Sequence, residues 1–161
     1  MNASDFRRAM GNFATGVTVV TTAREGRFYG FTANSLTAVS LDPLLLLVCV
    51  DRGGEAHREM ESCAAFAVNI LASDQKDLSN HFASRDTSGG DRLAGVPFRC
   101  GKTGAPVLDG ALAVLECVKA DRLDGGDHSI FIGRVEAGEI DPAQRDALVY
   151  FRGAYRSLGS E

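Results

Sequence analysis

Short runs of β-branched and apolar residues, each ended by a turn, constrain the fold of this 161-residue chain more than any other feature. Such runs favour β-strands, whereas Gly, Pro, Asn and Asp between them favour turns. The runs predict strands at residues 17–22, 28–33, 44–50, 64–71, 111–120, 130–137 and 148–151. Because these strands lie close together in sequence and Gly-rich turns join them, a β-barrel is expected rather than a βαβ sheet.

Three short helices complete the predicted pattern. The first begins at Ser4, the expected N-cap, continues with apolar residues at helical spacing and ends at Gly16. The second spans residues 55–62. Ser73 is expected to cap the third helix, which carries Phe82 on its apolar side. The strands outnumber the helices, so the predicted fold class is mainly β with short helices.

Composition limits the possible classes of protein. The chain is 45% hydrophobic and 24% charged, as expected for one domain with its own core, here residues 1–161. A net charge of −4 argues against a nucleic-acid partner, which would require a basic face. The apolar run at residues 44–50 is too short to span a membrane, and residues 1–10 do not resemble a signal peptide. The four cysteines lack metal-ligand spacing, so no metal site and a cytoplasmic protein with reduced thiols are expected.

The segment GFTANSLTAVS, residues 30–40, is rich in small polar side chains. Phe31 and Leu36 are its two large residues. A backbone of this kind can lie close to a flat ligand, while N–H groups, hydroxyls and the Asn34 amide meet the ligand's polar edge. The same composition is also common in an ordinary β-edge and turn. On composition alone, the ordinary edge is favoured.

The extended segment GFTANSLTAVSLDP resembles the flavin-contacting signature of the short-chain flavin reductases, which supply reduced flavin to two-component monooxygenases. FATGVTVVTT, GDHSIFIGRV and LVYFRGAYRSL continue the resemblance in the same order along the chain. The resemblance implies an FMN-binding split β-barrel with Greek-key topology, assembled as a homodimer with flavin near the subunit junction. It also implies an NAD(P)H-dependent reductase of FMN or FAD, using NADH or NADPH, that serves an oxygenase component.

The resemblance also implies which positions contact flavin. Residues 32–35 are expected to face the isoalloxazine ring, residues 50–52 to pass the ribityl chain and phosphate, and Arg85 to bind the phosphate. After this loop the chain departs from the family pattern, because Gly53 and Gly54 can offer bare N–H groups to an anion while Glu55 repels it. The complete set of implied flavin contacts is Thr32, Ala33, Asn34, Ser35, Val50, Asp51, Arg52, Ala56, Phe82 and Arg85.

A second set of positions is implied to hold the nicotinamide cofactor. It consists of His128, Tyr150, Phe151, Arg152 and Gly153. Without the resemblance, GGDHSI would be interpreted as a turn that contains a histidine. His57 and His81 are expected to be solvated on exposed helix faces. No catalytic residue is expected, because hydride transfer between two aligned rings requires no protein nucleophile or strong base.

Two alternatives remain open at this point. One is a flavin carrier on the same barrel that does not oxidise NAD(P)H. The other is a reductase whose flavin stays bound and passes electrons to a different acceptor, such as a cobalt corrinoid. The residues leave open the choice between FMN and FAD and between NADH and NADPH.

Overall fold

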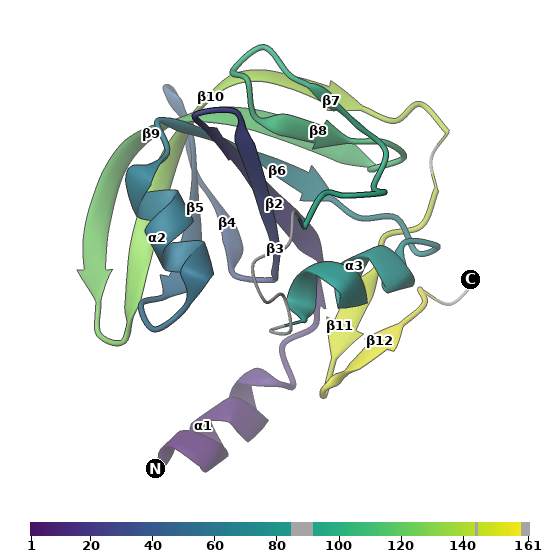
Figure 1. Cartoon of the computed structure of the whole chain (residues 1–161). Helices are drawn as coiled ribbons and strands as arrows, with labels where there is room; N and C mark the ends of the chain where they lie inside the picture. The colour runs from purple at the N-terminus through teal and green to yellow at the C-terminus, as the bar shows by residue number, and fades with distance from the viewer. Residues whose placement is uncertain (85–91, 144, 159–161) are drawn as a thin grey trace.

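Antiparallel β-structure dominates the computed structural model, which describes residues 1–84, 92–143 and 145–158 (Figure 1). The helices are α1 (Ala3–Met10), α2 (Glu55–Ser62) and α3 (Lys76–Ala83). The strands are β1 (Thr15–Gly16), β2 (Thr18–Arg24), β3 (Arg27–Ala33), β4 (Leu36–Leu41), β5 (Leu44–Asp51), β6 (Ala65–Ile70), β7 (Phe98–Cys100), β8 (Pro106–Leu108), β9 (Ala113–Gly125), β10 (His128–Ile140), β11 (Val149–Phe151) and β12 (Ala154–Arg156). The predicted mainly β fold with short helices is confirmed.

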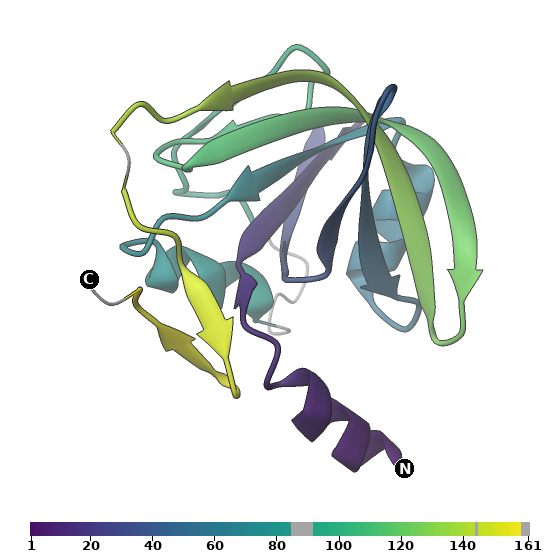
Figure 2. The same ribbon diagram turned by 180° about the vertical axis from the view of Figure 1, so that it is seen from behind.

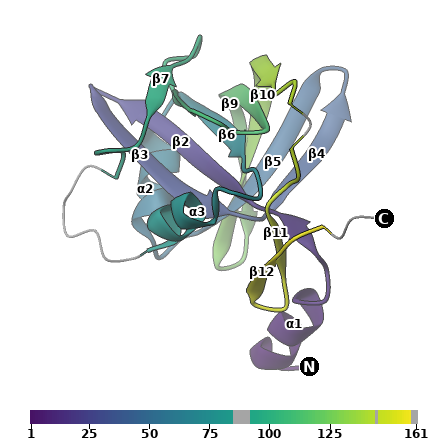
Figure 3. The same ribbon diagram turned by 90° about the vertical axis from the view of Figure 1, so that its right-hand side faces the viewer.

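The largest sheet has seven strands in the order β3-β2-β6-β9-β10-β5-β4, with every neighbouring pair antiparallel. Its two edge strands, β3 and β4, are consecutive in the chain and are separated only by Asn34 and Ser35. A connection this short spans about 10 Å, so the sheet has to curl until its two edges meet at these residues. Figure 3 shows the result, in which the β2–β3 and β4–β5 pairs diverge from a common end. Closure into a Greek-key split barrel and assembly into a homodimer stay predictions.

The hairpin of β9 and β10, in the middle of this sheet, is long and strongly curved (Figure 2). The pairing of these two strands shifts register between Ile132 and Gly133, and such irregularities bend a strand. Gly133 also permits close packing, because a Cβ atom there would lie 2.5 Å from Cζ of Phe66. Phe66 is fully buried in the core at this point.

Two of the three hydrophobic clusters among the described residues hold α2 and α3 in place. The larger one lies within the curl of the sheet and includes Val20, Val48, Phe66 and Phe131, with Met60 of α2 covering it. The second cluster packs α3 and the neighbouring loops against the other side of β2; its members are Val17, Val19, Leu71, Phe82, Leu93, Leu108 and Leu148. The two clusters fix α2 and α3 at different positions against the sheet, and the candidate site lies between these helices.

The first helix differs from the sequence prediction. Helix α1 ends at Met10 rather than Gly16, and Asn2, not Ser4, is its N-cap, because the Asn2 side chain accepts the N–H of Asp5 at 2.9 Å. The helix projects away from the sheet (Figure 1). Phe6 is consequently 58% exposed, so the apolar side of α1 has no partner among the described residues.

The start of the third helix also differs. Gln75, not Ser73, is the N-cap of α3, and the N–H of Ser73 instead donates to the carbonyl of Asp146 at 2.8 Å. This contact attaches the chain before α3 to the segment before β11. Among the helices of the described ranges, none combines the length and apolar character required to cross a membrane.

Candidate active site

A cleft of about 850 Å³ opens between α2, α3 and the end of the curled sheet where β3 meets β4. This volume is within the range of small-molecule sites. The described residues that line it are Val17, Tyr29, Phe31, Thr32, Ala33, Asn34, Ser35, Cys49, Val50, Asp51, Gly53, Gly54, Glu55, Ala56, Ser79, Phe82, Ala83, Ser84, Arg92, His128, Tyr150 and Tyr155. The structure therefore brings most residues of the two predicted sets, from seven different elements and turns, to one cavity.

The segment Thr32–Ser35 forms the wall of the cleft where the two sheet edges meet. The hydroxyl of Thr32 donates to the carbonyl of Ser79 at 2.7 Å and so attaches this wall to α3. The hydroxyl of Ser35 donates to the carbonyl of Cys49 at 2.9 Å and accepts the N–H of the same residue at 3.2 Å. Asn34 and Ser35 belong to neither strand, so their main-chain groups lie outside the sheet's hydrogen-bond ladder and can serve a ligand.

The turn from β5 into α2 forms the adjacent wall. The N–H of Gly53 donates to the Asp51 carboxylate at 2.8 Å, and the N–H of Gly54 donates to the Asp51 carbonyl at 3.3 Å. These two N–H groups are thus already used within the turn, which differs from the sequence expectation that they are offered to a phosphate. Glu55 and Ala56, the first two residues of α2, line the cleft, and the first N–H groups of a helix have no intrahelical partner.

Helix α3 contributes the apolar floor through Phe82. This side chain is 1% exposed and lies directly over Gly30, where a Cβ atom would be 2.6 Å from Cε1 of Phe82. The glycine in β3 therefore allows the ring to approach the sheet closely. Without it, α3 could not come this close to the Thr32–Ser35 wall.

Arg92 is a cleft residue that sequence reasoning missed. It is 8% exposed, its guanidinium lies 5.0 Å from the centre of the Tyr29 ring, and it donates to the carbonyls of Phe82 and Ser84. Burial raises the pKa of Tyr29, an effect that the Arg92 charge opposes. Nothing in the sequence pattern distinguishes Arg92, because its position is created by contacts between distant segments. The predicted phosphate ligand Arg85 lies outside the described residues.

His128 and Tyr150 occupy the mouth of the cleft. His128 pairs across the sheet with Asp51, and its Nδ1 lies 2.8 Å from the carboxylate of Asp127. This hydrogen bond lowers the pKa of Asp127. The ring of Tyr150 packs against Tyr155 at 5.5 Å, so the histidine and two aromatic rings lie around one opening.

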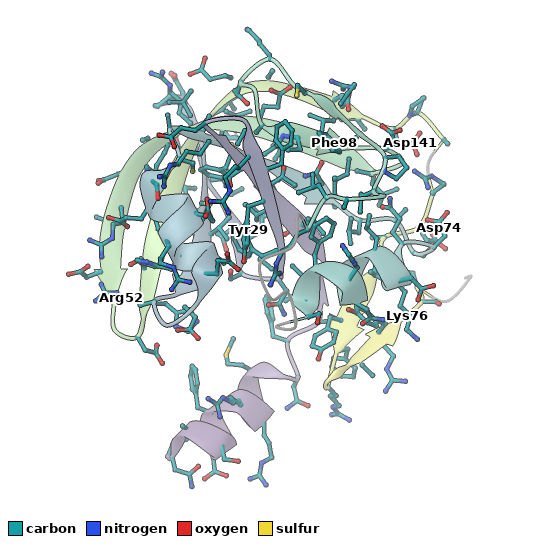
Figure 4. All side chains as sticks on the ribbon, viewed as in Figure 1. Tyr29, Arg52, Asp74, Lys76, Phe98 and Asp141 are labelled. Carbon is teal, nitrogen blue, oxygen red and sulfur yellow. The ribbon has the colours of Figure 1, made fainter. Side chains whose placement is uncertain are left out.

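The structure places other predicted residues away from the cleft. Arg52 donates from Nε to the hydroxyl of Ser129 at 3.2 Å and pairs with Asp124, and Figure 4 shows it on the outer side of α2, away from Tyr29. Phe151 lies under the guanidinium of Arg152, 4.9 Å from it. Arg152 and Gly153 form the β11–β12 turn and line a separate hollow.

The prediction that His57 is solvated is wrong. Its side chain is 14% exposed, its Nε2 lies 2.8 Å from the hydroxyl of Ser129, and its ring meets Phe131 edge-on at 5.6 Å. The reason is that this side of α2 packs against β10. His81 is exposed, as expected, but its Nε2 also contacts the Arg92 carbonyl at 2.7 Å.

Residues 10–159 match the flavin reductase like domain family, so the chain belongs to that family. It is 47% identical over 150 residues to a probable flavin reductase of Rhizobium meliloti, covering 92% of this chain and 47% of that protein. The chain thus spans about half the length of that relative. It is 36% identical to the reductase subunit of a flavin-dependent monooxygenase of Mycobacterium tuberculosis, covering 97% and 82%. An NADH:FAD oxidoreductase of Streptomyces globisporus, solved with NAD and FAD fragments, superposes with a TM-score of 0.91 at 37% identity, covering 98% and 93%.

Proposed function

We propose that this protein is an NAD(P)H-dependent flavin reductase, which reduces FMN or FAD with NADH or NADPH and supplies reduced flavin to the oxygenase component of a two-component monooxygenase. The observation that carries this proposal is the cleft itself, which joins the Thr32–Ser35 wall to His128 and Tyr150 at its mouth. The activity in the names of the M. tuberculosis and S. globisporus relatives supports the same reaction.

The shape of the cleft fits a flat aromatic ring with a polar edge. Ala33 and Ala56 leave room for close approach, while Phe82 and Val50 offer apolar surface. The main-chain groups of Asn34 and Ser35, outside the ladder, are the donors and acceptors for the polar edge. A flavin bound here would supply the acceptor for the nicotinamide hydride, and main-chain donors of the wall would tune its electronics.

The chain's own contribution is to orient the two rings. The hydrogen bonds of Thr32 to Ser79 and of Ser35 to Cys49 attach the Thr32–Ser35 wall to α3 on one side and to β5 on the other. His128 and Tyr150 would position the nicotinamide from the mouth. Holding two reactants in a near-attack geometry removes several kcal/mol of the barrier without an acid or base. The proposed reaction is therefore consistent with the described residues of the cleft, which include no nucleophile paired with a base.

We also propose that residues 1–161 form one flavin reductase domain that assembles as a homodimer. Several large apolar side chains are exposed on one copy, among them Phe6 (58%), Phe13 (70%) and Leu41 (85%). Stable protein interfaces bury about 800 Å² on each partner, and these side chains supply apolar area for such a contact. Light scattering that gives a monomer with full activity at micromolar concentration would contradict this assembly.

The test of the function mixes purified protein with NADH and a molar excess of FMN or FAD. The expected result is oxidation of many equivalents of NADH per protein and release of reduced flavin to solution. Flavin binding with NADH oxidation no faster than without protein would indicate the carrier alternative. Reduction of one bound flavin per subunit, without release, would indicate the reductase that serves another acceptor.

A further inference from the structure

Two acidic side chains lie at the turn from β5 into α2, which forms one wall of the cleft. Asp51 and Glu55 are the two carboxylates among the described residues that line the cleft. Neither carboxylate takes part in a salt bridge within the described ranges. Because no described cation is paired with them, their charges act on a ligand that enters the cleft.

The same turn has few donors left for an external anion. The N–H of Gly53 donates to the Asp51 carboxylate at 2.8 Å, and the N–H of Gly54 donates to the Asp51 carbonyl at 3.3 Å. Gly54 is the N-cap of α2, and Glu55 supplies an acidic side chain in the first turn, where it is favourable next to the positive end of the helix dipole. The chain therefore places its own carboxylates where a helix start would otherwise attract a phosphate.

The charge of Glu55 reaches the interior of the cleft. Burial is the main cause that raises the pKa of Tyr29; the Arg92 charge opposes this effect and the Glu55 charge adds to it. Arg92 is the one Lys or Arg among the described lining residues, and its guanidinium donates to the carbonyls of Phe82 and Ser84 at the end of α3. The Glu55 carboxylate, in contrast, accepts no hydrogen bond from the part of the chain that the structure describes.

Flavins differ in the charge of the tail attached to the ring. Riboflavin carries an uncharged ribityl chain, and FMN carries the same chain with a phosphate at its end. Ser35 of the wall bonds to Cys49, two residues before Asp51, so a tail that extends from the wall toward α2 passes Asp51 and Glu55. Like charges repel more strongly where part of the water is excluded. A phosphate on this path is consequently opposed, whereas an uncharged tail is not.

We propose that Glu55 determines flavin specificity by charge, so that the cleft binds a flavin with an uncharged tail, such as riboflavin, more tightly than a flavin that carries a phosphate. This inference rests on the proposed function, because it concerns the flavin of the same cleft. The ring contacts at the Thr32–Ser35 wall supply the affinity that all flavins share, and Glu55 lowers it when a phosphate is present. Weak binding of a phosphorylated flavin also favours its release after reduction.

The test compares wild type with Glu55→Gln, which removes the charge and keeps the size of the side chain. The matched control is Glu25→Gln, which makes the same change of net charge at the exposed β2–β3 turn, the end of that hairpin opposite the cleft. Each protein is titrated with riboflavin and with FMN in the absence of NADH, and binding is followed by flavin fluorescence. Because the two ligands differ only in the phosphate, the ratio of their dissociation constants isolates the effect of tail charge.

Wild type should bind riboflavin more tightly than FMN, and its affinity for FMN should rise with added salt, because salt screens the repulsion. Glu55→Gln should bind FMN about two- to tenfold more tightly than wild type does. Its riboflavin affinity and melting temperature should stay unchanged, and the control should match wild type.

An unchanged ratio of the two dissociation constants in folded Glu55→Gln would overturn the assignment and leave Glu55 as a residue that stabilises the start of α2. Wild-type binding of FMN that salt leaves unchanged or weakens would also overturn it, without the use of any variant. The expected binding pattern, followed by no oxidation of NADH when it is added, would remove the proposed function and keep Glu55 as the residue that selects the flavin tail.

Discussion

Substitution of Gly30 by alanine tests whether close packing of α3 on β3 shapes the Thr32–Ser35 wall. The new Cβ atom would lie 2.6 Å from Cε1 and 2.9 Å from Cδ1 of Phe82. The ring is 1% exposed and the Arg92 guanidinium donates to the carbonyl of the same residue, so Phe82 cannot simply rotate into solvent. The ring and the end of α3 must move together, and overpacking of this kind costs about 1–3 kcal/mol.

The expected result has two parts. At about 2–4 °C per kcal/mol for a chain of this size, the melting temperature of Gly30→Ala should fall by about 2–12 °C. Flavin affinity, measured by fluorescence titration, should also fall, because Phe82 lines the cleft and α3 accepts the hydroxyl of Thr32.

The matched control is Gly133→Ala, which creates a clash of similar size, 2.5 Å from Cζ of Phe66, in the core away from the cleft. This variant should lose stability and keep its flavin affinity at temperatures where it is folded. A Gly30→Ala/Phe82→Leu double variant should recover part of the lost stability, because the smaller side chain relieves the clash. If Gly30→Ala keeps both its melting temperature and its flavin affinity, the packing argument is refuted.

Two further predictions concern single side chains. Burial opposes ionisation of Glu116, but hydrogen bonds from the main-chain N–H groups of Thr103 and Lys102 outweigh it and lower the pKa of this carboxylate. Because the folded pKa is depressed, its contribution is present above the unfolded value and is lost as pH falls, so Glu116→Gln should cost about 1–3 kcal/mol at neutral pH and less in acid, measured by denaturant unfolding across pH. His128→Ala should lower kcat/KM for NADH by about twofold to a hundredfold with flavin affinity and melting temperature unchanged; a lower melting temperature with unchanged kinetics would make it a turn residue.

The sequence predicted well those helices and strands that neighbouring residues determine. The span of α2, Glu55–Ser62, and most of the strands follow from apolar runs and turn residues, and the structure has them within a few residues. The first helix was predicted too long and with Ser4 rather than Asn2 as its N-cap, and its apolar spacing did not reveal that Phe6 projects into solvent. Periodicity reports which side chains share a face but not what covers that face.

The part of the cleft that consecutive residues form could be predicted from the sequence. The part where distant segments meet could not. Residues 32–35 form one wall by themselves, and the motif around them was enough to place it. Arg92 comes into the cleft through its contacts with Tyr29 and Phe82, which sequence spacing does not reveal. Arg52 was predicted to contact flavin but lies away from the cleft. It follows Asp51 in the chain, yet its side chain donates to the hydroxyl of Ser129.

The central claim is that the Thr32–Ser35 wall is the surface on which flavin is reduced, and Ala33→Leu tests it most directly. The larger side chain would fill the space next to the wall, while Ala33 is only partly buried against the core, so the fold should survive. The measurement is the steady-state rate of NADH oxidation at increasing FMN concentration, for wild type and for Ala33→Leu with its melting temperature verified. Wild type should turn over rapidly, and the folded variant should show a rise in KM for FMN of tenfold or more, about 1.4 kcal/mol. An unchanged KM for FMN in folded Ala33→Leu would contradict the central claim and make this segment an ordinary part of the sheet.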